Sequence, residues 1–184
     1  MNNRLVISST IGYMCIGLTL WMLNLVDTHW VTGPNMHAQV MGFTLGAVVL
    51  GVIAILSFFH GRTLDAIIFF GFAAGLFTTS HHGGMGAGAD SAGTLGWFWL
   101  VWAIFVFYLW LASFKAGWAR SLLLLATWLS LLAYCLFFWL SWSGFDYISG
   151  YLGLFTGLVA TYISAAEIIN HSSGKVVLQT GAKD

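Results

Sequence analysis

Six apolar runs, separated by short polar or glycine-containing breaks, occupy most of the chain. A hydrocarbon core about 30 Å thick is crossed by roughly 20 apolar residues in a helix, so runs of this length predict membrane-spanning helices. The predicted spans cover residues 5–26, 36–59, 64–80, 95–116, 121–142 and 147–169, and the third is short. The pattern predicts an all-α membrane protein with six helices in a single domain, residues 1–184, and a short tail from about residue 171.

Small residues recur at helical spacing inside several predicted spans. The last span has the clearest stripe, Gly153, Gly157, Ala160 and Ser164, and glycine pairs occur at 42/46 and 71/75. Small side chains three or four residues apart allow helix backbones to approach closely in a membrane. We expect these stripes to be helix-packing faces.

Basic residues fall on one side of the predicted spans. They are Arg4, Arg62, Lys115, Arg120, Lys175 and Lys183. Because loops rich in Lys and Arg stay in the cytoplasm, both termini are predicted to be cytoplasmic. The opposite side carries Asp27, His29 and Asp146. It also carries tryptophans expected for an aromatic belt at the membrane surface: Trp30, Trp97, Trp99, Trp139 and Trp142.

The composition excludes a water-soluble domain, because only 7% of the residues are charged and 59% are hydrophobic. The first span has no small-residue cleavage site behind it, so we expect it to be retained. Cys15 and Cys135 both lie in apolar runs and are expected to be packing residues. The expected location is the cell (inner) membrane, with the lipid bilayer as a partner and no nucleic acid.

Four stretches of the chain carry a resemblance to a known family. They are the last span and tail, GYLGLFTGLVATYISAAEIINHSSGKVVLQTG; the first span, IGYMCIGLTLWMLNLVD; and the stretches HGRTLDAIIFFGF and LGWFWLVWAIFVFYLWLASFK. In this order, they resemble the C-terminal signature, the first helix, the start of the third helix and the fourth helix of the acetate uptake transporter family, which includes succinate-acetate permeases. Gly12 and Asn24 take matching places in its first helix. The resemblance implies six helices per protomer and a homo-hexameric ring with one pore in each protomer.

Two motifs of that family are absent. Residues 7–13 read ISSTIGY where the family has NPAPLGL, and residues 72–76 read FAAGL where it has YGxFW. The chain therefore resembles a divergent member, and the substrate is less firmly implied than the fold.

The resemblance also implies a pore constriction of apolar side chains. The family's positions fall on Ile16, Phe72 and Leu129, the last with a two-residue ambiguity after Lys115. An apolar ring resists water and hydrated ions, whereas a small, partly apolar solute such as acetate can pass. Packing or lipid-facing roles are the alternative for each residue.

Neutral polar groups within the spans could hold a monocarboxylate. They are Ser8, Ser9, Thr10, Asn24, Gln39, Thr44 and Thr78. Such groups also form ordinary bonds between packed helices. Apart from Lys115, at the very end of the fourth span, no Lys or Arg falls within a predicted span, so a dicarboxylate such as succinate is the harder substrate.

Glu167 and Asp65 are the acidic residues nearest to membrane depth. A carboxylate within the membrane is a candidate for proton coupling, which we consider for Glu167. The alternative is a helix-end charge that reaches water or pairs with Arg62, Arg120 or Lys175.

The longest polar break, TTSHHGGMGAGADSAG at residues 78–93, is predicted to be an external loop. His81, His82, Met85 and Asp90 include ligand types that suit copper or zinc, but adjacent histidines tend to point apart and no established ligand spacing is present. A solvated loop is the favoured interpretation, and no cofactor is expected. The other histidines lie in breaks or at helix ends, which disfavours a haem site.

The sequence thus predicts a non-enzymatic channel or transporter for acetate and related small monocarboxylates. Two alternatives stay open. One is a urea or short-amide channel, a separate family with similar length, span number and assembly, and the other is a metal-binding or redox membrane subunit that uses the His81–His82 loop.

Overall fold

The computed structural model describes residues 3–31, 36–85 and 92–181, and every element in these ranges is a helix. The order is α1 (Asn3–Asp27), α2 (Met36–Met41), the π-helix η1 (Gly42–Val49), α3 (Leu50–Phe59), α4 (Thr63–Met85), α5 (Ala92–Ala112), the 3₁₀ turn η2 (Ser113–Lys115), α6 (Trp118–Leu140) and α7 (Ser143–Ser173). In the described residues, five helical segments are long and apolar enough to cross a membrane. The apolar part of α4, Thr63–Thr79, is shorter.

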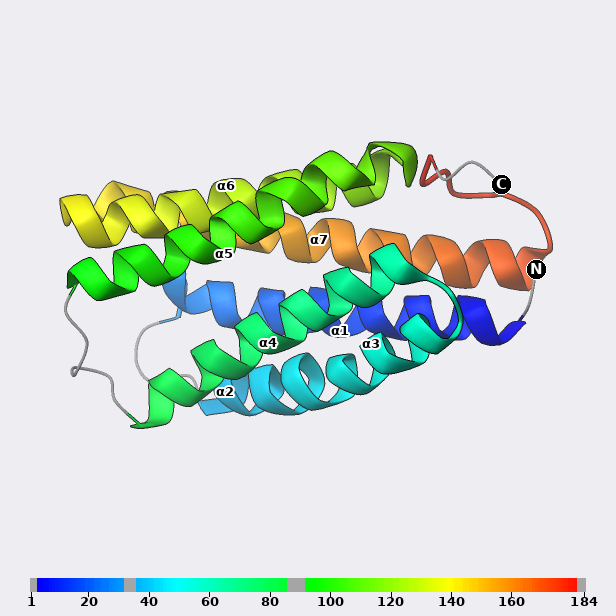
Figure 1. Cartoon of the computed structure of the whole chain (residues 1–184), viewed down its shortest axis with the longest axis horizontal. Helices are drawn as coiled ribbons and strands as arrows, with labels where there is room; N and C mark the ends of the chain where they lie inside the picture. Colours follow the sequence, from blue (N-terminus) through cyan, green and yellow to red (C-terminus); the bar gives the residue numbers. More distant parts are fainter. Residues whose placement is uncertain (1–2, 32–35, 86–91, 182–184) are drawn as a thin grey trace.

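The long helices run up and down beside one another, with both chain termini at the same end of the bundle (Figure 1). We call this the terminal end and the opposite end the loop end. Going round the bundle, α1 packs against α7, α7 against α6, and α6 against α5. On the other side, α4 packs against α3 and η1, and these two pack against α1. The helices therefore form a ring, in which α4 and α5 touch each other least.

The predicted small-residue stripe of the last span is a packing face, as expected. It lies against α1: a side chain at Gly157 would meet the backbone oxygen of Gly17, and the Ser164 hydroxyl donates to the Thr10 carbonyl oxygen at 3.0 Å. Close approach of the two backbones makes α1–α7 the most extensive helix contact in the bundle.

A tightly packed apolar core lies between the helices. Tyr13, Ile16 and Phe69 are fully buried in it, and the Tyr13 and Phe69 rings meet edge to face at 5.1 Å. Cys15 and Cys135 are also buried and free, in agreement with the packing role predicted for them.

Two predicted breaks differ from the structure. The segment predicted as a loop from residue 78 is helical through Met85, because α4 continues without a Pro to stop it. The tail is also not a loose extension. Residues 174–181 fold back along α7, where Asn170 Oδ1 accepts from the Val177 and Leu178 amides at 2.7 and 2.9 Å, and Ala119 N donates to Thr180 O at 3.2 Å. We call residues 174–181 the C-terminal strap.

Candidate functional site: an internal cavity and a buried ion-pair network

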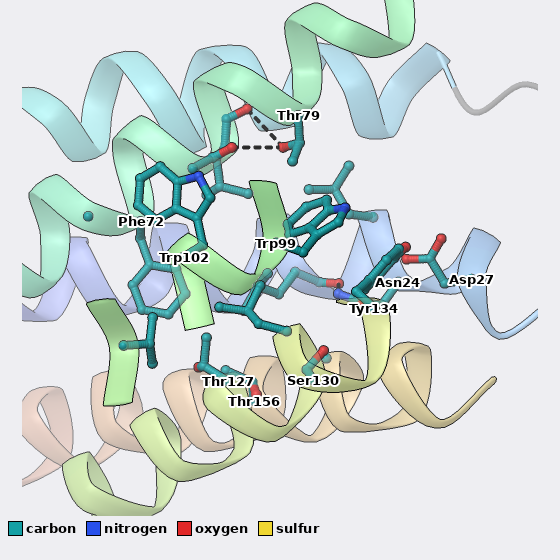
Figure 2. Close-up of a pocket in the computed structure, with 18 of the residues that line it drawn as sticks. Asn24, Asp27, Phe72, Thr79, Trp99, Trp102, Thr127, Ser130, Tyr134 and Thr156 are labelled. Atoms are coloured by element: carbon teal, nitrogen blue, oxygen red, sulfur yellow. Dashed lines mark hydrogen bonds between the residues drawn. The ribbon is translucent and has the colours of Figure 1, made fainter. Parts of the chain in front are cut away.

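A cavity of about 430 Å³ lies inside the ring of helices (Figure 2). Its lining comes from α1, α2, α4, α5, α6 and α7. Asp27, Gln39 and Tyr134 line it near the loop end, and Ile68 and Leu124 line it toward the terminal end. The cavity therefore extends from the loop end into the middle of the bundle.

Aromatic and aliphatic side chains make up most of the wall. Phe72 of α4 and Trp99, Trp102 and Phe105 of α5 line it, and the Trp99 ring stacks on Tyr134 of α6 with centroids 4.9 Å apart. Figure 2 shows Phe72 and Trp102 on one side of the cavity. Aromatic rings provide large apolar surfaces with fixed shapes, so this wall suits a small solute with an apolar part.

Polar groups are confined to a few places on the wall. They belong to Asn24, Asp27, Gln39, Thr79, Thr127, Ser130, Tyr134 and Thr156. Asn24 Nδ2 donates to the Leu20 carbonyl oxygen at 2.8 Å, which fixes the amide beside Gly153 of α7. Asp27 and Tyr134 lie next to each other at the loop end (Figure 2), and the Tyr134 hydroxyl is hydrogen-bonded to the Asp27 carboxylate.

The packed core closes the cavity toward the terminal end. Phe72 and Leu131, which line the cavity, also pack against the core cluster that contains Ile16 and Phe69. Beyond this apolar layer, at the terminal end, lies a network of charged and hydroxyl side chains.

Arg120 is the centre of that network. Its Nε donates to the Tyr13 hydroxyl at 3.0 Å and lies 3.3 Å from Asp65 Oδ1, and its Nη2 lies 3.3 Å from Glu167 Oε1. Arg62 forms a second ion pair with Asp65. The arginine of α6 thus connects α1, α4 and α7.

The hydroxyls of α1 complete the network. Ser9 and Thr10 both donate to Glu167 Oε2, and the Tyr13 hydroxyl donates to Asp65 Oδ1 at 2.9 Å. Two arginines and two carboxylates give the network no net formal charge. Pairing and hydrogen bonding of this kind are what allow charges to be held away from water.

Arg120 corrects one expectation from the sequence. It was placed in a break, but α6 begins at Trp118 and includes it, with its side chain only 15% exposed. The Gly117 that precedes the helix has φ +110°, so the chain turns there and α6 starts three residues before Ser121. The predicted pairing of Asp65 and Glu167 with Arg62 and Arg120 is confirmed.

The three predicted constriction residues are not brought together in one place. Phe72 lines the cavity, Ile16 is buried in the core next to it, and Leu129 is 39% exposed on the surface of the bundle. Leu131, which the two-residue ambiguity also allows, lines the cavity. A constriction formed by these residues stays a prediction.

The predicted polar residues divide into three sets. Asn24 and Gln39 line the cavity, and Ser9 and Thr10 belong to the ion-pair network. Thr44 and Thr78 donate to the carbonyl oxygens of Val40 and Gly75 within their own helices and do not line the cavity. The side chain of Ser8 lies outside the described part. Proton coupling at Glu167 stays a prediction.

The predicted metal ligands lie outside the described side chains. The backbone of His81, His82 and Met85 belongs to α4, but their side chains, and the whole of Asp90, are not described. Among the described residues, no group of three His, Cys, Asp or Glu side chains converges as a metal site would require.

Several residues of the cavity were missed by sequence reasoning. Thr127, Ser130 and Tyr134 lie three and four residues apart, so they share one face of a helix, and this spacing could have identified them. Trp99 was assigned to the belt at the membrane surface, but it lines the cavity. Its neighbour Trp97, 62% exposed, does face outward.

No protein-family model matches this chain, and no curated protein sequence matches it. Its structure is similar to that of the bacterial acetate channel SatP, with a TM-score of 0.88 over 95% of this chain and 98% of that chain. The two sequences are 19% identical. The chain therefore has the same helical fold as that channel.

Proposed function

We propose that this protein is a non-enzymatic pathway for acetate and related small monocarboxylates across the cell (inner) membrane. The single observation that carries the proposal is the cavity inside a bundle whose fold matches an acetate channel over nearly the whole of both chains. A route through the centre of each protomer needs such a space, and its mainly apolar wall suits a solute with a methyl group.

In this proposal the chain crosses the membrane six times. The third crossing is α4, whose described apolar part is Thr63–Thr79. The solute enters the cavity at the loop end and must pass an apolar layer before it reaches the terminal end. Phe72 and Leu131, packed against the core around Ile16, form this layer in our proposal. Such a barrier opposes hydrated ions through the cost of removing their water.

A homo-hexameric ring, with one route in each protomer, belongs to the same proposal. Many large apolar side chains lie on the outer surface, among them Phe70, Val101 and Phe114, which are more than half exposed. In the ring, part of this surface would contact lipid and part would contact neighbouring protomers.

The test is solute uptake into liposomes that contain the purified full-length protein. Radiolabelled glycolate is the probe, because its hydroxyl group slows its passage through lipid and keeps the background low. Uptake above that of empty liposomes, reduced by excess acetate, is the expected result. Absence of protein-dependent uptake would remove the proposal.

Two variants on the same helix sharpen this test. Phe72→Ala removes a ring from the cavity wall and is expected to raise glycolate uptake several-fold, whereas Phe70→Ala removes an exposed ring and is expected to leave it within twofold of wild type. Equal effects of the two substitutions would argue against a barrier at Phe72.

A urea or short-amide channel is the second candidate, because the polar groups on the cavity wall are mostly neutral. Radiolabelled urea in the same liposomes separates the two candidates. Urea uptake that exceeds glycolate uptake would favour the second.

A further inference from the structure

The serine and threonine hydroxyl groups on the cavity wall already donate their protons to backbone carbonyl oxygens. A serine or threonine hydroxyl has one proton to donate and two lone pairs that accept. Thr127 donates to Leu123 O at 2.8 Å, Ser130 to Ser149 O at 2.9 Å, Thr156 to Leu152 O at 2.9 Å, and Thr79 to Gly75 O at 3.1 Å. These four groups therefore present hydrogen-bond acceptors to a solute.

The loop end of the cavity adds a stronger acceptor. Asp27 lines the cavity there, and the Tyr134 hydroxyl directs its proton to that carboxylate. An ionised carboxylate only accepts hydrogen bonds. When it is ionised, Asp27 therefore attracts donors and repels anions.

The charged groups around Asp27 do not reverse this effect. Asp146 of α7 is close enough to act on it electrostatically, as is His29, which follows α1 and lies 3.1 Å from Asp146. Among the described residues that line the cavity, none is Lys or Arg. Arg120, at the other end of the bundle, is already paired with Asp65 and Glu167.

The side-chain N–H groups of the residues that line the cavity are neutral. Asn24 has a second amide N–H besides the one bonded to Leu20 O, and Gln39, Trp99 and Trp102 have an amide or an indole N–H. A few neutral donors suit a carbonyl oxygen. They do not replace the charged partners or the several donors that a carboxylate needs when it leaves water.

We propose that the cavity takes its solute as an uncharged hydrogen-bond donor, namely the protonated form of a short carboxylic acid, and that Asp27 is the residue that excludes the anion. This inference rests on the proposed function and specifies the form of the substrate. The O–H of the acid donates to the acceptors of the wall, and its carbonyl oxygen accepts from an amide or indole N–H.

The size of the exclusion follows from Coulomb's law. Two like charges about 6 Å apart, at an effective dielectric constant of about 20, disfavour occupancy by roughly a hundredfold. Salt reduces this factor, so we expect Asp27 to lower anion passage at least tenfold.

The pH change inside vesicles, measured together with solute uptake, tests the proposal. Liposomes that contain the full-length protein, the pH indicator pyranine, and potassium with valinomycin on both sides at pH 7 receive external radiolabelled glycolate. Glycolic acid that enters uncharged releases its proton inside and acidifies the lumen. Glycolate that enters as the anion stays ionised at pH 7, leaves the lumen pH almost unchanged, and requires potassium to follow it.

We expect wild-type protein to acidify the lumen at least about threefold faster than empty liposomes. Asp27→Asn is expected to add glycolate uptake that depends on valinomycin and does not acidify the lumen, with an anion flux at least tenfold above wild type. Asp146→Asn is the matched control, because it removes a carboxylate of the loop end that does not line the cavity, and it is expected to acidify like wild type.

Valinomycin-dependent glycolate uptake without acidification in the wild-type protein would overturn the inference and leave the proposed function standing. A folded Asp27→Asn protein that acidifies the lumen like wild type and shows no anion flux would also overturn the inference. Glycolate uptake and lumen pH that both follow empty liposomes, in wild type and in both variants, would remove the proposed function, and the inference with it.

Discussion

Arg120 connects α6 to three other helices through Tyr13, Asp65 and Glu167. Removing one partner of a buried ion pair leaves the other charge without compensation, which costs about 3–5 kcal/mol. We therefore expect Arg120→Leu to lower the free energy of unfolding in detergent by roughly that amount, measured by titration with a denaturing detergent. Lys115→Leu, which removes an exposed basic residue five positions earlier, is expected to change it by less than about 1 kcal/mol. Equal stabilities for Arg120→Leu and wild type would show that the network does not hold the helices together.

Gly153 lies where α7 crosses the side chain of Asn24. A Cβ atom there would overlap the Asn24 amide, so Gly153→Ala must displace either the amide or the helix. We expect a loss of about 1–3 kcal/mol in the free energy of unfolding, together with altered solute uptake, because Asn24 lines the cavity.

Gly51→Ala is the matched control, because the nearest atom to its added Cβ would be Ala73 Cβ at an ordinary 4.0 Å. Both substitutions replace a helical glycine, so the gain in helix propensity is the same in each. If Gly153→Ala were as stable as Gly51→Ala, the contact between α1 and α7 would have to be looser than described.

The sequence predicts only some of the side-chain contacts that the structure contains. The pairing of Glu167 with Arg120 was among the predicted alternatives, because both lie near one membrane boundary. The side chains that face the cavity were mostly missed, because a polar residue in a span is equally consistent with a bond to its own helix. Thr44 makes such a bond on the outside of the bundle, and Thr127 makes the same bond beside the cavity.

The C-terminal strap depends on one side chain of α7. Asn170 accepts from the amides of Val177 and Leu178 and donates to Leu178 O at 2.7 Å. Asn170→Ala removes all three bonds, so we expect amide hydrogen exchange at residues 177 and 178 to become about tenfold faster. Mass spectrometry of the exchanged protein measures this.

Ser172→Ala, on the exposed face of the same turn, is the control and is expected to leave that exchange unchanged. Unchanged exchange in Asn170→Ala would mean that other contacts, such as Ala119 N to Thr180 O, are enough to hold the strap.

The sequence predicted the positions of the long helices well, because their apolar composition is enough to locate them. It predicted their local geometry and their ends less well. Apolar runs located the long helices, because a continuous apolar run of about 20 residues satisfies its own backbone hydrogen bonds in lipid as a helix. The second run gave no sign that Gly42–Val49 is a π-helix, because a wide helical turn has no hydrophobic pattern of its own. The polarity of residues 78–85 suggested a loop, although Ser and His are tolerated in a helix.

The position of both termini at one end of the bundle gives a test of the whole architecture. Green fluorescent protein fused to either terminus is expected to fluoresce, and alkaline phosphatase fused there is expected to be inactive, because the basic residues predict a cytoplasmic location. Phosphatase fused after residue 142, between α6 and α7, is expected to be active. An active phosphatase at either terminus would contradict the predicted orientation.

The ion-pair network has a consequence for how the protein is made. Arg62 and Arg120 belong to the set of basic residues that predicts the orientation, yet in the finished bundle both are paired with Asp65. Arg62 lies three residues before Asp65 in the chain, so that pair can form within one helix end. Arg120 meets Asp65 and Glu167 of two other helices, so this pairing forms only when α4, α6 and α7 come together. In the predicted orientation, the charge of Arg120 therefore first helps to orient its helix and later fastens the helices together.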